Sequence, residues 1–415
     1  MGHAKLVDNN PIKRYPDFLR RLSKDQPETD VFVVPVVIDM RSDNADETLK
    51  RLVADFPIHR VIDNYDEQYA ELLLSQHAHL YRANFEVQKS SIADMLSEHY
   101  GKTEPWRLGS WVYFPWNSQL VHVLNQKDFE DLRTIRNRDL ITKEEQAILA
   151  DFSTACFGMS VGSAAALGLT ISGISRQISL VDGAVISGSN LNRILTGITS
   201  VGQKKCEVIA RQIYEMNPYS EVRTYDKADK DNIDDILGSS SPVNLAVDEI
   251  DDIEMKIRIR LQARKKRIPV IMATELADTF MIDVERFDLE PNRQIFHGMI
   301  PGIEDVAENP PENHREWTKH AVNIIDPSNM SIKMQKSLMK IGSTIVTHPQ
   351  LGSTVMATGG ALAFAAKSIA LGWELKSGRY VVSLEKQMLA DHKTRKYRVR
   401  HKKHTKTIHK AVKSM

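Results

Sequence analysis

The stretch from Thr154 to Lys205 constrains the fold more than any other part of this 415-residue chain. It reads as an apolar strand (154–157), a glycine turn, an Ala- and Leu-rich helix over about 161–172, and a second strand (177–181) that ends at Asp182. Small residues in such a turn let the backbone approach a phosphate, and the helix N-terminus offers free N–H groups and the positive end of its dipole. The segment therefore predicts either a nucleotide site or a purely structural strand–turn–helix unit.

The positions of one acid and two cations favour the nucleotide site. Asp182 stands 24 residues after Gly158, close to the ~20-residue spacing at which an acid meets a nucleotide ribose. The turn itself is a weak signal, because Gly158 and Gly162 form GxxxG and not GxGxxG. Arg193 and Lys205 follow the acid by 11 and 23 residues, and a dehydrogenase requires neither of them. Two cations beside a phosphate turn suit a triphosphate whose charge grows during phosphoryl or adenylyl transfer.

Four short motifs resemble those of one enzyme family. The segment DGAVISGSNLNR (182–193) resembles the D-x-D-x-V-x-x-S-N-L-x-R motif of the ThiF, MoeB and ubiquitin-activating enzymes, and GQKK (202–205) resembles their G-Q-x-K. Asn217-Pro218 matches the family's N-P, and DEIDD (248–252) is similar to its D-x-x-D-N. The resemblance implies an ATP-dependent adenylyltransferase that uses Mg²⁺.

The resemblance also assigns roles to the matching residues. It implies nucleotide binding by residues of the glycine turn and of the loop after the second strand: Gly158, Ser160, Gly162, Asp182, Asn190 and Gln203. Arg193 and Lys205 are implied to neutralise the triphosphate, and Asp251 to hold Mg²⁺, which usually takes one or two protein carboxylates beside substrate phosphates. Arg138 resembles a family arginine that reaches the triphosphate, often from the other subunit. A plain solvated position stays open for Arg138 and for Asp251.

Several residues depart from the family pattern. Ala184 stands where relatives often have a second acid, and Phe157 and Met159 make the glycine turn bulkier than usual. The sequence has no CxxC pair, so no structural zinc is expected. No cysteine follows Cys206, so transfer of an acyl group to a thiol of the same chain is not expected. The implied reaction is attack of a substrate carboxylate on ATP, which gives an acyl-adenylate and pyrophosphate.

Length and pattern divide the chain into four parts. We predict an α/β accessory domain over 1–130 that helps to select a substrate, because this region combines strand-like runs, amphipathic helices and a hairpin. Strands and helices alternate over 131–300, which predicts a Rossmann-like, doubly wound α/β core with a mostly parallel sheet. Residues 301–385 extend this core with a buried helix over 354–371, and 386–415 form a basic tail.

Composition and charge indicate the class of protein and the kinds of partner that the chain could bind. Hydrophobic residues make up 42% of the chain and charged residues 26%, as in ordinary soluble globular proteins. The N-terminus has no apolar signal region and the apolar helix carries Lys367, so a cytoplasmic protein without a membrane span is expected. From Asp391 onward there are ten Lys or Arg and one Asp, which predicts either an RNA-binding surface or a solvated, partly disordered end. The resemblance also implies a homodimer.

Three functions stay open at the level of sequence. The first is ATP-dependent adenylation of a carboxylate on a small carrier protein, a peptide or a modified RNA. The second is a nucleotide- or NAD-binding Rossmann protein without catalysis, which Ala184 and the bulky turn would suit. The third is a degenerate scaffold that pairs with a partner.

Overall fold

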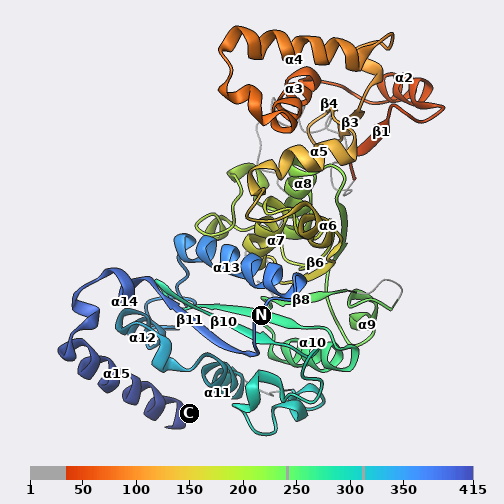
Figure 1. Cartoon of the computed structure of the whole chain (residues 1–415). Coiled ribbons are helices and arrows are strands. Elements are labelled where there is room, and N and C mark those ends of the chain that lie inside the picture. The colour runs from red at the N-terminus through yellow and green to blue at the C-terminus, as the bar shows by residue number, and fades with distance from the viewer. Residues whose placement is uncertain (1–33, 240–242, 311–313, 415) are drawn as a thin grey trace, which may run out of the picture. The chain divides into compact units, whose positions relative to one another are not determined.

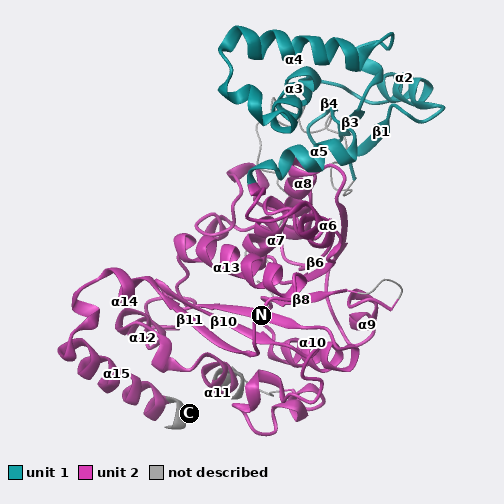
Figure 2. Ribbon diagram, in the orientation of Figure 1, with its two compact units in different colours: residues 1–136 teal, residues 137–415 magenta. Residues whose placement is uncertain are grey.

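A computed structural model describes residues 34–239, 243–310 and 314–414 of the chain (Figure 1). The chain forms two compact units, residues 1–136 and 137–415 (Figure 2). Each unit has its own sheet, and each is described by itself.

The first unit is built on a four-stranded sheet with the order β1-β3-β4-β2. Strands β3 and β4 form the predicted antiparallel hairpin, whereas β2 pairs parallel to β4 at the edge. The strands are β1 (Val36–Asp39), β2 (Arg60–Asp63), β3 (Ser110–Phe114) and β4 (Gln119–Val123). The helices are α2 (Ala45–Asp55), α3 (Tyr65–Gln76), η2 (Ala78–Arg82), α4 (Phe85–Tyr100), η3 (Pro105–Arg107) and α5 (Gln126–Arg133).

A buried histidine joins the sheet of this unit to its helices. His122 is 1% exposed and stacks between Trp111 at 4.4 Å and Tyr65 at 4.7 Å between ring centroids. Its Nδ1 lies 2.8 Å from the Asp63 carboxylate and its Nε2 lies 2.8 Å from the Leu108 carbonyl oxygen. The ring is therefore fixed on both faces and at both nitrogens, and Trp111 packs in the core of this unit.

The second unit contains a seven-stranded sheet with the order β11-β10-β9-β8-β5-β6-β7. Strands β9, β8, β5, β6 and β7 are parallel, and β10 and β11 add two antiparallel pairings at one edge. The strands are β5 (Thr154–Phe157), β6 (Gln177–Val181), β7 (Glu221–Tyr225), β8 (Leu245–Asp248), β9 (Val270–Glu275), β10 (Thr279–Glu285) and β11 (Gly378–Ser383). The predicted Rossmann-like, mostly parallel α/β fold is confirmed.

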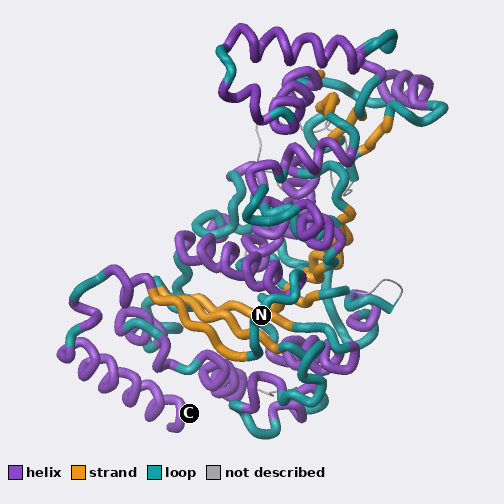
Figure 3. Tube along the Cα trace, viewed as in Figure 1, coloured by secondary structure: helices purple, strands orange, loops and turns teal. Residues whose placement is uncertain are grey.

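Helices cover both faces of this sheet (Figures 1 and 3). Helices α7 (Gly162–Ile171), α8 (Lys205–Met216) and α13 (Gly352–Ala370) pack on one face, and α9 (Ile233–Ile236) and α10 (Ile253–Lys266) on the other. Helix α13 lies where the sequence predicts a helix over 354–371, and it is buried on one side only, since Met356 and Phe364 are exposed. It crosses α7 closely, because a Cβ on Gly359 would lie 2.5 Å from the carbonyl oxygen of Ala164.

Short elements connect this framework. They are η4 (Ile135–Asn137), α6 (Lys143–Asp151), η5 (Gly188–Asn190), η6 (Ile198–Ser200), η7 (Ile295–Gly298), η8 (Ile303–Ala307), α11 (His314–Ile325), η9 (Pro327–Asn329), α12 (Ile332–Leu338), α14 (Leu384–Met388) and η10 (Asp391–Lys393). No helix in the part of the chain that the structure describes is both long and apolar enough to cross a membrane.

The basic tail is folded. It forms α15 (Arg395–Ser414), which packs against α12 and η9. Tyr397, Thr405 and Ile408 are buried on the inner side of this helix, and the Thr405 hydroxyl accepts a 2.9 Å hydrogen bond from the side-chain amide of the buried Gln335. The expectation of a partly disordered end is therefore wrong for this segment, because an apolar stripe at helical spacing anchors it to the second unit.

Candidate functional site

The site lies where the strand order reverses. From β5 the chain continues to β6 on one side, whereas β8 pairs with β5 on the other side and leads on to β9. A crevice for ligands forms at the carboxyl ends of the strands at such a switch point. Two predicted segments meet there, namely the glycine turn after β5 and the acidic segment after β8.

Gly158 is required by the geometry of the turn. Its φ is +85°, and a Cβ at this position would lie 2.4 Å from the carbonyl oxygen of Glu249. The side chains of the neighbouring Phe157 and Met159 are fully buried, so their bulk does not obstruct the turn. Helix α7 begins at Gly162, so its first N–H groups, which have no partner inside a helix, face the turn.

Asp182 ties the glycine turn to the start of α8. Its carboxylate accepts hydrogen bonds of 2.8 Å from the backbone N–H groups of Met159 and of Ala184. The Lys205 ammonium lies 3.2 Å from the same carboxylate, and both side chains are largely buried, at 12% and 14% exposure. Ala184 thus contributes its backbone at the place where relatives often have a second acid.

Arg193 reaches the same turn from the following loop. Its Nε donates a 3.0 Å hydrogen bond to the Ser160 hydroxyl, and its Nη1 donates to the Ser189 carbonyl oxygen at 3.0 Å and to the Asn192 side chain at 2.9 Å. Burial lowers the pKa of Arg193, while the charges of Asp251 and Glu275 favour the charged form. Both predicted cations therefore stand at the phosphate turn.

Asn190 and Gln203 shape the loop between these cations. The side-chain oxygen of the buried Asn190 accepts a 3.0 Å hydrogen bond from the Ser187 N–H, which closes the short η5 turn. The Gln203 side chain donates to the Thr199 carbonyl oxygen at 3.0 Å and accepts from Arg211 at 2.6 Å. In the structure these two side chains hold the loop, and their direct contact with a nucleotide stays a prediction.

Asp251 follows β8 and is exposed at the crevice. The next residue, Asp252, caps α10 by accepting a 2.8 Å hydrogen bond from the Met255 N–H, whereas the side chain of Asp251 is exposed. The negative charge of Asp251 acts on Arg193 and His348. Among the described residues no group of three or more His, Cys, Asp or Glu has the geometry of a metal site. A single exposed carboxylate beside a phosphate turn nevertheless fits Mg²⁺, which keeps waters and substrate oxygens as its other ligands.

Sequence reasoning missed the acid at the end of β9. Glu275 is 8% exposed, and burial raises its pKa to about 7, with the charge of Asp251 adding to the rise. Glu249 accepts a 2.6 Å hydrogen bond from the Ala273 N–H, and burial together with Glu275 raises its pKa well above the ordinary range. The signal was present, because an acid that ends a buried parallel strand lies at the same sheet edge as Asp251.

His348 completes this side of the site. It belongs to the segment before α13, and burial lowers its pKa, with the nearby Arg193 adding to the effect. No sequence motif singled it out, because it is 97 residues from Asp251 in the chain.

Arg138 and the two cysteines lie outside this set of contacts. Arg138 is half-buried between η4 and α6, where the side chain of the preceding Asn137 donates a 3.0 Å hydrogen bond to Gln146. Its reach to a triphosphate stays a prediction. Cys156 and Cys206 are buried; burial raises the pKa of both thiols, that of Cys206 to about 12. Neither supplies a ready thiolate.

The motifs around this crevice match a known family. The model of the ThiF family matches residues 133–407, which is well over half of the chain. The chain belongs to the ThiF family. It is also 33% identical over 275 residues to the uncharacterized protein MT1398 of Mycobacterium tuberculosis (strain CDC 1551 / Oshkosh), in a match that covers 66% of this chain and 38% of that protein. The chain thus spans well under half the length of this relative.

Two solved structures illustrate the likeness to other proteins. PaaA overlaps 75% of this chain and 93% of its own, with 18% identity and a TM-score of 0.45. The E. coli tRNA N6-threonylcarbamoyladenosine dehydratase TcdA in complex with AMP overlaps 58% of this chain and 95% of its own, with 22% identity and a TM-score of 0.40.

Proposed function

We propose that this ThiF-family chain is an adenylyltransferase that activates a carboxylate with ATP. The observation that carries the proposal is the convergence of Arg193 and Lys205 on the phosphate turn and its partner Asp182. The first N–H groups of α7 and the two cations would then hold the triphosphate. Asp251 would hold Mg²⁺, which supplies charge neutralisation at the phosphates when bound. A non-catalytic dinucleotide protein has no need for two cations at this turn.

The reaction requires the protein to position the reacting groups and to neutralise the negative charge on the phosphates. A substrate carboxylate oxygen attacks the α-phosphorus, the bond to the bridging oxygen breaks, and pyrophosphate leaves with the electron pair. The negative charge that grows on the phosphates is met by Arg193 and Lys205, which are already in place and need no rearrangement.

The first test measures nucleotide binding, and the second measures exchange of pyrophosphate into ATP. Calorimetry with ATP and Mg²⁺, and separately with NAD, is expected to show binding of ATP alone. Exchange of labelled pyrophosphate into ATP is then measured with a panel of carboxylates, namely peptides, a small carrier protein that ends in Gly-Gly, and carboxylated tRNA. Binding of NAD alone would point to the Rossmann protein without adenylation, and binding of neither nucleotide would point to the scaffold.

We further propose that RNA carries the carboxylate, because α15 presents a basic face. Its outward-facing side chains include eight Lys or Arg between residues 395 and 410, all exposed, and the helix contains no acid. Such a surface releases counterions from a phosphate backbone.

The triple variant Lys402→Glu, Lys403→Glu, Lys406→Glu is expected to weaken binding of unfractionated tRNA at least about tenfold and to reduce the salt slope by about 2, since each lost contact to a single strand accounts for roughly 0.7. The matched control reverses three exposed cations of the first unit, Lys50, Arg51 and Lys89, and is expected to bind as the unchanged protein does. Equal affinity of both variants would remove RNA as the partner of α15.

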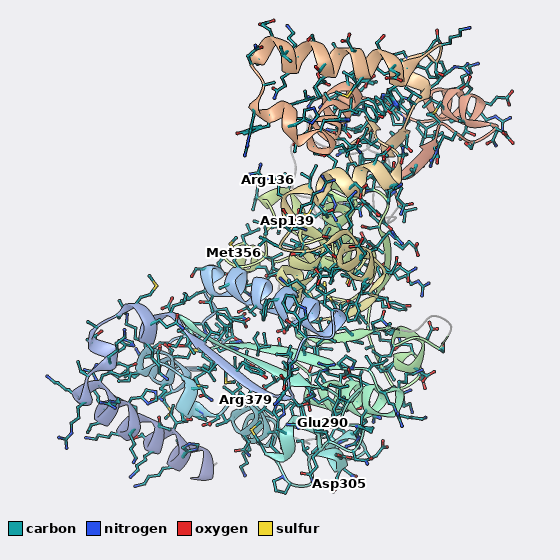
Figure 4. All side chains as sticks on the ribbon, in the orientation of Figure 1. Arg136, Asp139, Glu290, Asp305, Met356 and Arg379 are labelled. Atoms are coloured by element: carbon teal, nitrogen blue, oxygen red, sulfur yellow. The ribbon has the colours of Figure 1, made fainter. Side chains whose placement is uncertain are left out.

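A homodimer through α13 is the second part of the proposal on partners. Met356, labelled in Figure 4, is 66% exposed, and Phe364, two turns further along the helix, is 55% exposed. Gly360 lies between them and is open to solvent, so one face of this helix is apolar and accessible.

The variant Met356→Lys, Phe364→Lys is expected to sediment as a monomer at a concentration at which the unchanged protein is a dimer. Leu289→Lys, a change at a 67% exposed apolar residue elsewhere on the second unit, serves as the control and is expected to remain dimeric. A monomeric unchanged protein would contradict the dimer.

A further inference from the structure

A second pocket lies at the amino ends of three strands of the seven-stranded sheet. Phe152, Val243 and Ile268 line it, and each stands two residues before the first residue of its strand, β5, β8 or β9. These strands are neighbours and parallel, so their amino ends meet at one edge of the sheet. The crevice of the candidate site lies at their carboxyl ends. A ligand in this pocket therefore binds at the opposite edge of the sheet from the phosphate turn.

The pocket has the size and the walls of a small-molecule site. Its volume is about 460 Å³, whereas ligand pockets range over roughly 300–1,000 Å³. Besides the three residues before the strands, Leu237, which follows α9, and Ile369, near the end of α13, contribute apolar side chains. Walls of this kind favour the apolar body of a ligand, because binding removes that body from water.

The charges at the pocket leave one cation over. The ammonium of Lys266 lies 3.0 Å from Asp234, and the guanidinium of Arg286 lies 2.7 Å from Asp288, so both charged lining residues Lys266 and Asp288 have partners. Arg267 also lines the pocket, its side chain is exposed, and no described residue pairs with its guanidinium. The pocket thus retains one positive charge that is open to a ligand.

The end of helix α10 does not by itself account for an arginine at position 267. The φ of Arg267 is +56°, a left-handed conformation in which helices usually end on glycine because a side chain is strained there. The backbone bond that closes the helix, 2.8 Å from the Ile268 N–H to the Ala263 carbonyl oxygen, does not involve the side chain of residue 267. The last turn of α10 already carries three basic residues toward the helix dipole. The strained backbone therefore calls for another explanation.

A neutral donor accompanies this cation. The side-chain oxygen of Asn244 accepts hydrogen bonds from the backbone N–H of Ser153 at 2.8 Å and from its hydroxyl at 2.9 Å. This fixes the amide group, whose NH₂ has no partner among the described residues, and Asn244 lines the pocket as well. An amide N–H and a guanidinium are both hydrogen-bond donors to carboxylate oxygens.

We propose that this pocket binds a small organic acid that has an apolar ring and a single carboxylate. The walls contact the ring, and Arg267 and Asn244 bind the carboxylate. A cationic ligand would be repelled by Arg267, and a triphosphate carries more negative charge than one arginine neutralises. The inference is independent of the proposed adenylation, because it uses none of the residues of the crevice.

The test compares two probes of the same shape on the full-length protein. Naphthalene-2-carboxylate has the ring and the single charge, and naphthalene-2-carboxamide has the same ring without the charge. Calorimetry is expected to show binding of the carboxylate about tenfold tighter than that of the amide, the usual gain from a hydrogen bond to a charged group. Added salt is expected to reduce this difference, because the cation is exposed.

Variants assign the two parts of the ligand to the pocket. Arg267→Gly is expected to weaken binding of the carboxylate about tenfold, to the level of the amide, and to raise the midpoint of thermal unfolding by about 2 °C, since glycine adopts the left-handed conformation without strain. Val243→Phe fills the pocket and is expected to weaken binding of both probes. Lys265→Ala removes an exposed cation of the same helix end that does not line the pocket, and is expected to bind both probes normally.

Three results would overturn the inference. They are absence of carboxylate binding at millimolar concentration, equal affinity for the two probes, and unchanged carboxylate affinity in Arg267→Gly. Loss of binding in Arg193→Ala would place the probe in the crevice and would overturn it too, whereas binding that persists in this variant supports the separate pocket. None of these measurements depends on ATP, so failure of the proposed adenylation would leave this inference in place.

Discussion

The variant Arg193→Ala is expected to lower carboxylate-dependent pyrophosphate exchange about 10³-fold, which corresponds to a loss of about 4 kcal/mol of transition-state stabilisation. Arg193 is held against Ser160 by a 3.0 Å hydrogen bond and against the loop backbone at Ser189 by another. A guanidinium that is already placed at the phosphate turn meets the growing charge without reorganisation. Measurement of kcat and KM for ATP in the exchange assay gives the size of the effect.

Two further variants show whether the loss belongs to catalysis. Arg193→Lys keeps the charge and loses the planar fork, so an intermediate loss is expected. Arg223→Ala removes an exposed arginine on β7 and is expected to exchange normally. Thermal unfolding of Arg193→Ala close to that of the unchanged protein excludes misfolding as the cause. Exchange at more than about a tenth of the normal rate would contradict a role for Arg193 at the phosphates.

The elements that sequence predicts well are those with local signals. Strands β5 and β6 have the predicted bounds, because each is a short apolar run limited by a turn residue. The need for glycine at position 158 and the place of Asp182 at the end of β6 also follow from the chain itself. Local motifs of this kind fix where the phosphate turn and its first acid lie.

The parts that sequence reasoning missed depend on contacts between distant segments. Glu275 ends a strand whose neighbour in the sheet is β8, and His348 comes from the segment before α13, some seventy residues later. Nothing in either local pattern shows that both interact with Arg193. The basic tail shows a different limit of sequence-based prediction. Its many Lys and Arg residues indicated a solvated end, and the helical spacing of the buried Tyr397, Thr405 and Ile408, which anchor it as α15, was overlooked.

The largest effect on stability is expected from Arg260, on α10. This side chain is fully buried; its Nε lies 2.6 Å from Glu285 and its Nη1 lies 2.5 Å from Asp248. The guanidinium also stands 4.1 Å above the ring of Phe296. The other oxygen of Glu285 accepts a 2.7 Å hydrogen bond from the Phe296 N–H, so this one arginine connects α10 with β8, β10 and η7.

Arg260→Met is therefore expected to lower the free energy of unfolding of the second unit by about 3–5 kcal/mol, because it leaves the buried Glu285 without a cation and the buried Asp248 with Lys256 alone, at 3.3 Å. Arg260→Lys keeps a charge but not both hydrogen bonds, and an intermediate loss is expected. Lys376→Met is the control, since it breaks a pair with Glu374 in which both side chains are more than 70% exposed, and the expected loss is below about 1 kcal/mol. Urea unfolding followed by tryptophan fluorescence and circular dichroism measures all three.

The ion pairs of Arg260 are also connected to the candidate site, because Asp248 directly precedes the segment that contains Asp251. Asp248, which receives Arg260, is the last residue of β8, and the segment from Glu249 to Asp251 follows directly. Asp248 also accepts a 3.3 Å hydrogen bond from the Ile250 N–H. Arg260→Met is therefore also expected to weaken the Mg²⁺ dependence of ATP binding at temperatures where the variant is still folded. If the variant loses less than about 1 kcal/mol of stability, the ion pairs with Asp248 and Glu285 do not stabilise the fold. If it is destabilised as expected but binds ATP and Mg²⁺ normally, the segment that carries Asp251 is fixed by the sheet alone.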